Sequence, residues 1–246
     1  TTMFETIATY YVQVFAVILP ALVIGLIAIG AHRSGLSRPR TATAIGVVAA
    51  LLGVWHALSV NLAKAGILMP PLQATDPPYA LMPLLGGAFL LWALGRWTET
   101  GRTILGGLDH IHLISIQSLR LMGGFFLIGW AMGDIPWQFA LPAGIGDIMA
   151  GIAAIQAMRA LDRGDANAER LVRRASIIGL LDFAVAVSLG IVTSVGFMQL
   201  MAFDNPNIIN AYPLALFPEY FVPIFIAFQL FSLGALRRHS TQIAAA

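Results

Sequence analysis

Long apolar runs recur along the whole chain, and they restrict it to one broad kind of fold. Seven runs reach about 20 residues, the length of helix that crosses a hydrocarbon core roughly 30 Å thick. Only 11% of the residues are charged, whereas a soluble domain carries roughly 25%. The sequence therefore predicts an all-α polytopic membrane protein in which residues 1–246 form a single domain. We place the seven transmembrane helices at about 8–31, 42–66, 79–98, 108–133, 137–160, 175–202 and 214–236.

The loops between these runs differ sharply in charge. Segments 32–40, 95–102, 159–174 and 237–240 hold nearly all the arginines, and the alternating segments 68–80, 133–136 and 202–213 contain no Arg or Lys. Positively charged loops stay on the cytoplasmic side of a membrane. We therefore expect the N-terminus outside and the C-terminus inside. In a bacterium this means a multi-pass protein of the inner (cytoplasmic) membrane.

Two pairs of segments suggest an internal repeat. Residues 11–25 and 136–151 both contain Gln, then Phe-Ala, then Leu-Pro-Ala, and residues 79–87 and 214–223 both open a span with Ala-Leu, a large apolar residue and Pro. This predicts half-repeats at 8–98 and 137–236 around a connecting helix at 108–133. Because an odd helix separates them, the halves would have the same orientation, which gives a 3+1+3 parallel repeat about the membrane normal.

Two charged residues lie deep inside predicted spans. Arg120 is about 18 Å along the fourth span from one side, and Asp147 is about 15 Å along the fifth from the other. Buried charges in a membrane face the bundle interior and pair with one another. The spans are joined by a short turn, and Gly144 and Gly151 allow close approach beside Asp147. We therefore predict an Arg120–Asp147 ion pair near the midplane.

A third acid has a different expected position. Asp182 lies about 10 Å from the inner side of the sixth span when that span begins at residue 175. At that depth it would be nearer to Arg173 and Arg174 than to the midplane pair. We therefore expect Asp182 to be separate from the predicted site.

Further polar residues lie in the outer half of the predicted bundle. These residues and the ion pair can also be explained by purely structural roles. The ion pair could fix helix register, His56 could be a hydrogen-bonded interior residue, and Glu219 could stabilise a helix start. An intramembrane ionisable group is also a functional-site hypothesis. The hypothesis is a polar ligand-binding pocket open to the outside, formed by His56, Gln117, Arg120, Asp147 and Glu219.

Several kinds of chemistry find little support. The chain has no cysteine, which excludes disulfides, iron–sulfur clusters and Cys-ligated zinc. It has no HExxH or GxSxG motif and no DxxD-type acidic cluster. Only His56 is deep enough to bind a midplane haem. A net charge of +2 is too small to suggest nucleic-acid binding. We therefore expect no catalytic residues, metal site or cofactor, although enzymatic activity stays open.

Three segments carry a resemblance to known sequences: 117–130 (QSLRLMGGFFLIGW), 139–154 (FALPAGIGDIMAGIAA) and 212–238. They resemble a group of bacterial seven-span membrane proteins with an ALPAGxGD segment, whose activity is not assigned. The layout is also similar to SWEET-type carriers and microbial rhodopsins. The PQ dipeptide of the former and the retinal-binding lysine of the latter are missing here. These similarities imply topology and location only.

Three functions compete at this level. The first is transport of a small polar or anionic solute, with Arg120 holding the anionic group and Asp147 or Glu219 exchanging a proton. The second is a non-transporting, receptor-like ligand binder or an accessory membrane subunit. The third is a haem-binding protein or another membrane enzyme. Besides the lipid bilayer and the ligand, the small-residue stripes leave room for a homo-oligomer or a larger complex.

Overall fold

The computed structural model describes residues 2–245, with side chains as far as residue 237. Between residues 2 and 245 it contains helices and loops but no strand, which confirms the all-α class. Residues 238–240 of the predicted basic tail lie outside the described side chains. The α-helices are α1 (Met3–Arg33), α2 (Arg38–Lys64), α3 (Gly87–Trp97), α4 (Glu99–Gly106), α5 (His110–Ser115), α6 (Phe125–Ala131), α7 (Trp137–Asp162), α8 (Ala168–Thr193) and α9 (Val222–Ala245); η1 (Met82–Gly86) and η3 (Phe217–Phe221) are π-helical, and η2 (Ile116–Gly124) is a 3₁₀ helix.

Six helical segments are long and apolar enough to cross a membrane, so the chain is a multi-pass integral membrane protein. They are Met3–Arg33, Arg38–Lys64, His110–Ala131, Trp137–Asp162, Ala168–Thr193 and Phe217–Arg237. The third predicted span, 79–98, is divided between η1 and α3, which have five and 11 residues. These are shorter than the roughly 20 residues that a full crossing needs. The seven-span count therefore remains a prediction.

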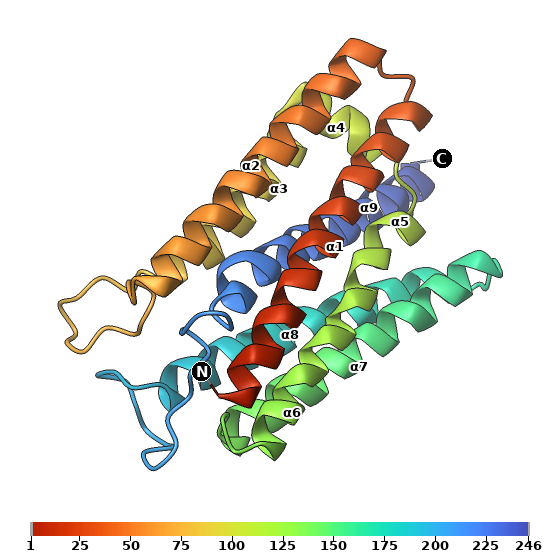
Figure 1. Ribbon diagram of the computed structural model, residues 1–246. Helices are drawn as coiled ribbons and strands as arrows, with labels where there is room; N and C mark the ends of the chain where they lie inside the picture. The colour runs from red at the N-terminus through yellow and green to blue at the C-terminus, as the bar shows by residue number, and fades with distance from the viewer. Residues whose placement is uncertain (1, 246) are drawn as a thin grey trace.

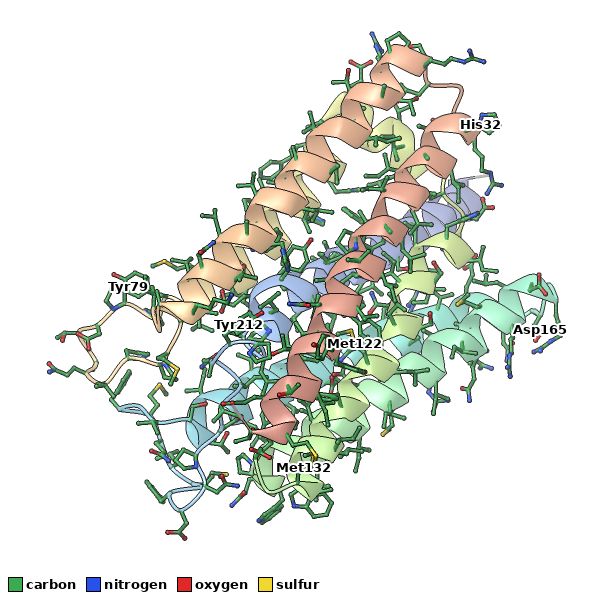
Figure 2. The ribbon with its side chains drawn as sticks, in the orientation of Figure 1. His32, Tyr79, Met122, Met132, Asp165 and Tyr212 are labelled. Carbon is green, nitrogen blue, oxygen red and sulfur yellow. The ribbon has the colours of Figure 1, made fainter. Side chains whose placement is uncertain are left out.

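The connections alternate between two ends of the bundle (Figure 1). The N-terminus and segments 65–81, 132–136 and 194–216 lie at one end, which we call the proline-rich end. The turns at 34–37 and 163–167, together with α4, lie at the other, which we call the arginine-rich end. Figure 2 shows Tyr79 and Tyr212 toward the first end and His32 and Asp165 toward the second, with Met122 between them. Which end faces outside remains a prediction from loop charge.

The interior is built around η3 and α9. Phe221, Ile224 and Ala227 are fully buried there, whereas α2 buries only Leu52, Ser59 and Ala63 and leaves most of its surface exposed. Helices α7 and α8 pack tightly through small residues, and the fully buried Ala154 and Ala157 belong to α7. Small side chains let helix backbones approach closely in a membrane, where packing rather than hydrophobic burial holds helices together.

The fourth span is interrupted in its middle. Between α5 and α6, residues Ile116–Gly124 form a 3₁₀ helix, which has 3.0 residues per turn. Residues three apart therefore lie directly above one another, and Gln117, Arg120 and Gly123 share one face. A mid-helix 3₁₀ stretch often marks a functional or strained segment.

Two further irregular turns occur at the proline-rich end. Pro83 is the second residue of η1, and Pro218 is the second residue of η3. Proline lacks the N–H donor of a regular helix and its ring crowds the preceding turn, so a widened turn relieves both problems. The two π-helical turns lie at equivalent places in the proposed half-repeats, and they contact each other. The repeat itself remains a prediction.

Candidate functional site

Arg120 is the centre of a buried ion cluster. Its Nε donates to Oδ1 of Asp147 at 2.7 Å, its Nη1 donates to the carbonyl oxygen of Gly179 at 2.8 Å, and its Nη2 binds the carboxylate of Asp182. The guanidinium carbon lies 3.6 Å from the ring centroid of Phe183, a cation–π contact. The Arg120 side chain is fully buried. The predicted Arg120–Asp147 ion pair is therefore present, as part of a larger group.

The cluster joins three membrane-spanning segments. Arg120 comes from η2, Asp147 from α7 and Asp182 from α8. We call these three residues the triad. With all three groups ionised it holds one positive and two negative charges. Removing one partner of a buried ion pair typically costs about 3–5 kcal/mol, so the triad also fixes how the segments pack.

The expectation that Asp182 lies apart from the site is wrong. Helix α8 begins at Ala168, seven residues before the predicted start of the span. The depth of Asp182 in the membrane was therefore counted from the wrong residue. Counted from the proline-rich ends of their helices, Trp137 for α7 and Thr193 for α8, Asp147 and Asp182 both lie about 15 Å deep. A count from that end would have placed the two carboxylates at one level.

Three glycines make room for the triad. A β carbon at Gly123 would collide with the carboxylate of Asp147, and one at Gly146 would collide with that of Asp182. A β carbon at Gly179 would collide with Gln229 Nε2 and stand 2.5 Å from Arg120 Nη1. Within the segment FALPAGIGDIMAG, Gly146 therefore makes room for the carboxylate of Asp182, while Gly144 and Gly151 let Leu127 and Leu121 of the neighbouring span approach closely. Gly123 reaches Asp147 because the 3₁₀ helix puts it on the same face as Arg120.

A cavity of about 310 Å³ leads from the proline-rich end to the triad. Asp147 lies at its base and is 13% exposed, while the buried Arg120 and Asp182 do not line it. The lining is mostly apolar and includes five phenylalanines, four in the walls and Phe197 in a loop. The polar lining residues Asp76 and Asn210 belong to the loops at the proline-rich end. Among the described side chains, no Arg, Lys or His lines it. The aromatic walls are Phe126, Phe139, Phe183 and Phe217.

Two loops roof this cavity. The loop at 65–81 contributes Pro70, Pro71 and Asp76, and the loop after α8 contributes Gly196 and Phe197. The backbone N–H of Phe197 donates to the carbonyl oxygen of Pro71 at 3.1 Å, which ties the two loops together. Loops that cover a cavity and can separate are typical gates for a ligand.

Buried polar groups continue from the triad toward the arginine-rich end. Gln117 Nε2 donates to the carbonyl oxygen of Phe225 at 2.9 Å. Its Oε1, both amide atoms of Gln229, and the hydroxyls of Ser176 and Ser232 have no hydrogen-bond partner among the described residues. A buried polar atom without a partner costs about 1–3 kcal/mol. The geometry therefore leaves several donors and acceptors available deep in the bundle.

His56 and Glu219 lie outside the triad. His56, on α2, is half-buried, and its ring packs against Tyr220 with centroids 5.4 Å apart. Glu219, in η3, is 1% exposed, and neither carboxylate oxygen has a hydrogen-bond partner among the described residues. Its neighbour Pro218 lines the cavity, but Glu219 does not. Of the five predicted site residues, the structure brings Arg120 and Asp147 into contact and puts Gln117 one 3₁₀ turn away.

A second cavity, of about 510 Å³, opens toward the arginine-rich end between α1, α2, α3, α4 and α9. It contains none of the predicted site residues. Arg40 is the charged group in its lining, and its Nη1 lies 3.8 Å from the carboxylate of Glu99. The first cavity is therefore the better candidate site, because it reaches the triad and the second does not.

Residues 77–237 match the family described as "Domain of unknown function (DUF8737)". That match covers more than half of the chain. The chain belongs to this family. The DUF8737 segment contains the whole triad and nearly all of the cavity wall, while α1, α2 and the Pro70–Asp76 part of the roof precede it. No curated protein and no solved structure matches the chain.

Proposed function

We propose that this DUF8737 protein transports a small, mostly apolar organic cation across the membrane, and that the ligand binds in the cavity above Asp147. The observation that carries the proposal is the charge of the cavity. Its only two ionisable lining residues are Asp76 at the mouth and Asp147 at the base, and the remaining wall is almost entirely apolar. Such a site favours a ligand with an apolar body and one positive end.

The aromatic walls support the same ligand class. Phe183 already stacks on the guanidinium group of Arg120, and Phe126, Phe139 and Phe217 line the space above it. Aromatic faces attract cations electrostatically, most strongly where water is excluded. An ammonium group near Asp147 would therefore meet a carboxylate and aromatic rings together.

The expected anionic solute is less compatible with this geometry. Each nitrogen of the Arg120 side chain already donates to a carboxylate or a carbonyl. An anion would have to displace Asp147 or Asp182 from a buried ion pair and would meet another carboxylate as it entered. The triad also carries one more carboxylate than cation, so a cationic ligand would balance its charge.

The way the cavity is closed fits a transporter. Beyond the triad, toward the arginine-rich end, a cluster of buried apolar residues seals the bundle: Ile114, Ala154, Ala157, Val172, Ala175 and Leu236. A cavity open toward one side and a seal on the other are the features of one state of an alternating-access carrier. We propose that the proline-rich end faces outside, as the loop charges predict, in the inner membrane of a bacterium.

The closed end equally favours a second candidate, a receptor-like binder that never opens to the other side. Uptake by proteoliposomes separates the two. Labelled 2-phenylethylamine, an apolar amine that fits the proposed class, is offered to vesicles containing the wild-type protein or Asp147→Asn. Saturable uptake above that of protein-free vesicles, lost in Asp147→Asn, supports transport. Saturable binding to the purified protein without uptake supports the binder, and the absence of both contradicts the proposed ligand class.

A further inference from the structure

Four buried polar side chains lie on the arginine-rich side of the triad, on three different helical segments. Gln117 lies three residues before Arg120 on the same face of η2, Ser176 lies three residues before Gly179 on α8, and Ser232 lies three residues after Gln229 on α9. In each case the step leads from the triad toward the arginine-rich end. We call Gln117, Gln229, Ser176 and Ser232 the polar file.

The file is joined to the triad by direct packing. A β carbon at Gly179 would collide with Nε2 of Gln229 and stand 2.5 Å from Nη1 of Arg120, so these two side chains meet at the same point on α8. The amide of Gln117 donates to the carbonyl oxygen of Phe225, one helical turn from Gln229. Three segments, η2, α8 and α9, thus present polar side chains to one another where apolar packing is the rule.

The unpaired polar atoms of the file need hydrogen-bond partners. Each of the four side chains is no more than 1% exposed, and together they present five donor or acceptor atoms without a hydrogen-bond partner among the described residues. Nearly all buried polar groups in proteins are hydrogen-bonded, and where side chains or backbone do not serve, ordered water does. A charged or anionic occupant is disfavoured, because the amides and hydroxyls carry no net charge.

We infer that the polar file holds a chain of water molecules that conducts protons between the triad and the arginine-rich end. This inference deepens the proposed transport function and rests on it for its purpose. A proton bound to a carboxylate oxygen of the triad passes to the first water, each water hands one proton to the next, and the last releases one proton to the solution. No bond other than O–H bonds forms or breaks. The apolar cluster around Ile114 and Leu236 closes the file in this conformation.

Because the chain has no cysteine, single introduced cysteines report directly on water in the file. The test compares Ser176→Cys with Ala157→Cys in nanodiscs. Both positions are fully buried, but Ala157 belongs to the apolar cluster. The probe is hydrogen peroxide, a neutral molecule close to water in size, and oxidation of the thiol is followed by mass spectrometry; Ala166→Cys, in the exposed α7–α8 turn, gives the upper limit of the rate. We expect Ser176→Cys to react roughly tenfold faster than Ala157→Cys, because a thiol must ionise in water to react.

Equal inertness of the two buried cysteines would overturn the inference. Ser232→Cys provides the same comparison on α9, so a folding defect at position 176 does not decide the result. A second readout is proton movement during uptake of 2-phenylethylamine, followed by a pH-sensitive dye inside vesicles. Gln229→Leu should abolish this signal, and Gln156→Leu, on the exposed face of α7, should retain it. Retention of the signal in Gln229→Leu would count against the file.

The outcomes separate this inference from the proposed function. If the amine binds or is taken up but Ser176→Cys and Ser232→Cys are inert, the cavity is a ligand site and the proposed proton path is wrong. If the cysteines react but the protein neither binds nor transports the amine, the file is hydrated and the proposed substrate is wrong.

Discussion

Gly123 packs directly against the carboxylate of Asp147, and a β carbon on Gly123 would overlap it. Gly123 reaches this position because η2 is a 3₁₀ helix, which stacks it above Arg120 on the face that meets α7. The contact of glycine with aspartate therefore holds the carboxylate within reach of Arg120 while its edge remains exposed to the cavity.

We expect Gly123→Ala to destabilise the protein by about 1–3 kcal/mol, because overpacking displaces a buried group from its partner. Unfolding in detergent, followed by tryptophan fluorescence, measures the change. Gly53→Ala is the matched control, since no atom lies within 4 Å of a β carbon at that helical position. The control should be as stable as the wild type or slightly more stable. Equal stability of the two variants would show that the close contact is not required.

The triad should behave as one unit in a double-mutant cycle. Asp147→Asn and Asp182→Asn each leave Arg120 with one carboxylate partner, so each should cost about 1–2 kcal/mol. The double variant leaves a buried guanidinium group without a counter-charge, a situation that costs about 3–5 kcal/mol. The double loss should therefore exceed the sum of the single losses by about 1 kcal/mol or more. Additive losses would mean that Arg120 does not need both acids.

Filling the cavity should prevent ligand binding without disturbing the triad. Ala186 lines the cavity from α8, and Ala184 lies on the exposed side of the same helix. Ala186→Phe should weaken binding of 2-phenylethylamine at least tenfold, equivalent to about 1.4 kcal/mol, whereas Ala184→Phe should bind it like the wild type. Isothermal titration of the purified proteins provides the comparison. Normal binding by Ala186→Phe would place the ligand elsewhere.

The roof loops should control access to the cavity. A β carbon at Gly196 would lie 3.1 Å from that of Pro70, close enough that a small adjustment brings a disulfide within range. We expect oxidised Pro70→Cys/Gly196→Cys to bind the amine with a slower association rate, and reduction to restore it. Each single variant serves as a control that cannot cross-link within the chain. An unchanged rate in the oxidised protein would indicate entry by a route other than the roof.

The sequence predicted the class of protein and the Arg120–Asp147 pair because both follow from simple energetics. Long apolar runs fit a bilayer, and a charge inside one of them needs a partner. The short turn between the fourth and fifth spans then leaves little choice of partner for Arg120. Loop charge gave an orientation, and the structure agrees that the basic turns gather at one end.

The remaining features depend on local geometry that periodicity does not reveal. The sequence pattern does not show that residues 116–124 form a 3₁₀ helix, which places Gly123 against Asp147. The predicted start of the sixth span at residue 175 lies seven residues after the true start of α8, and this separated Asp182 from the pair. The predicted polar pocket became a mostly apolar cavity because Gln117 turns toward Phe225 and Glu219 is buried beside the cavity rather than in its wall. These outcomes depend on tertiary packing.

In the proposed mechanism, the cavity selects a cation through Asp147. This selection is tested most directly by calorimetric binding of three ligands that share a phenyl-and-two-carbon frame but differ in charge: 2-phenylethylamine, 2-phenylethanol and phenylacetate. We predict that the amine binds most tightly and phenylacetate least, and that Asp147→Asn removes the preference for the amine over the alcohol. Tighter binding of phenylacetate than of the amine, or a preference for the amine that persists in Asp147→Asn, would show that Asp147 does not select a cation.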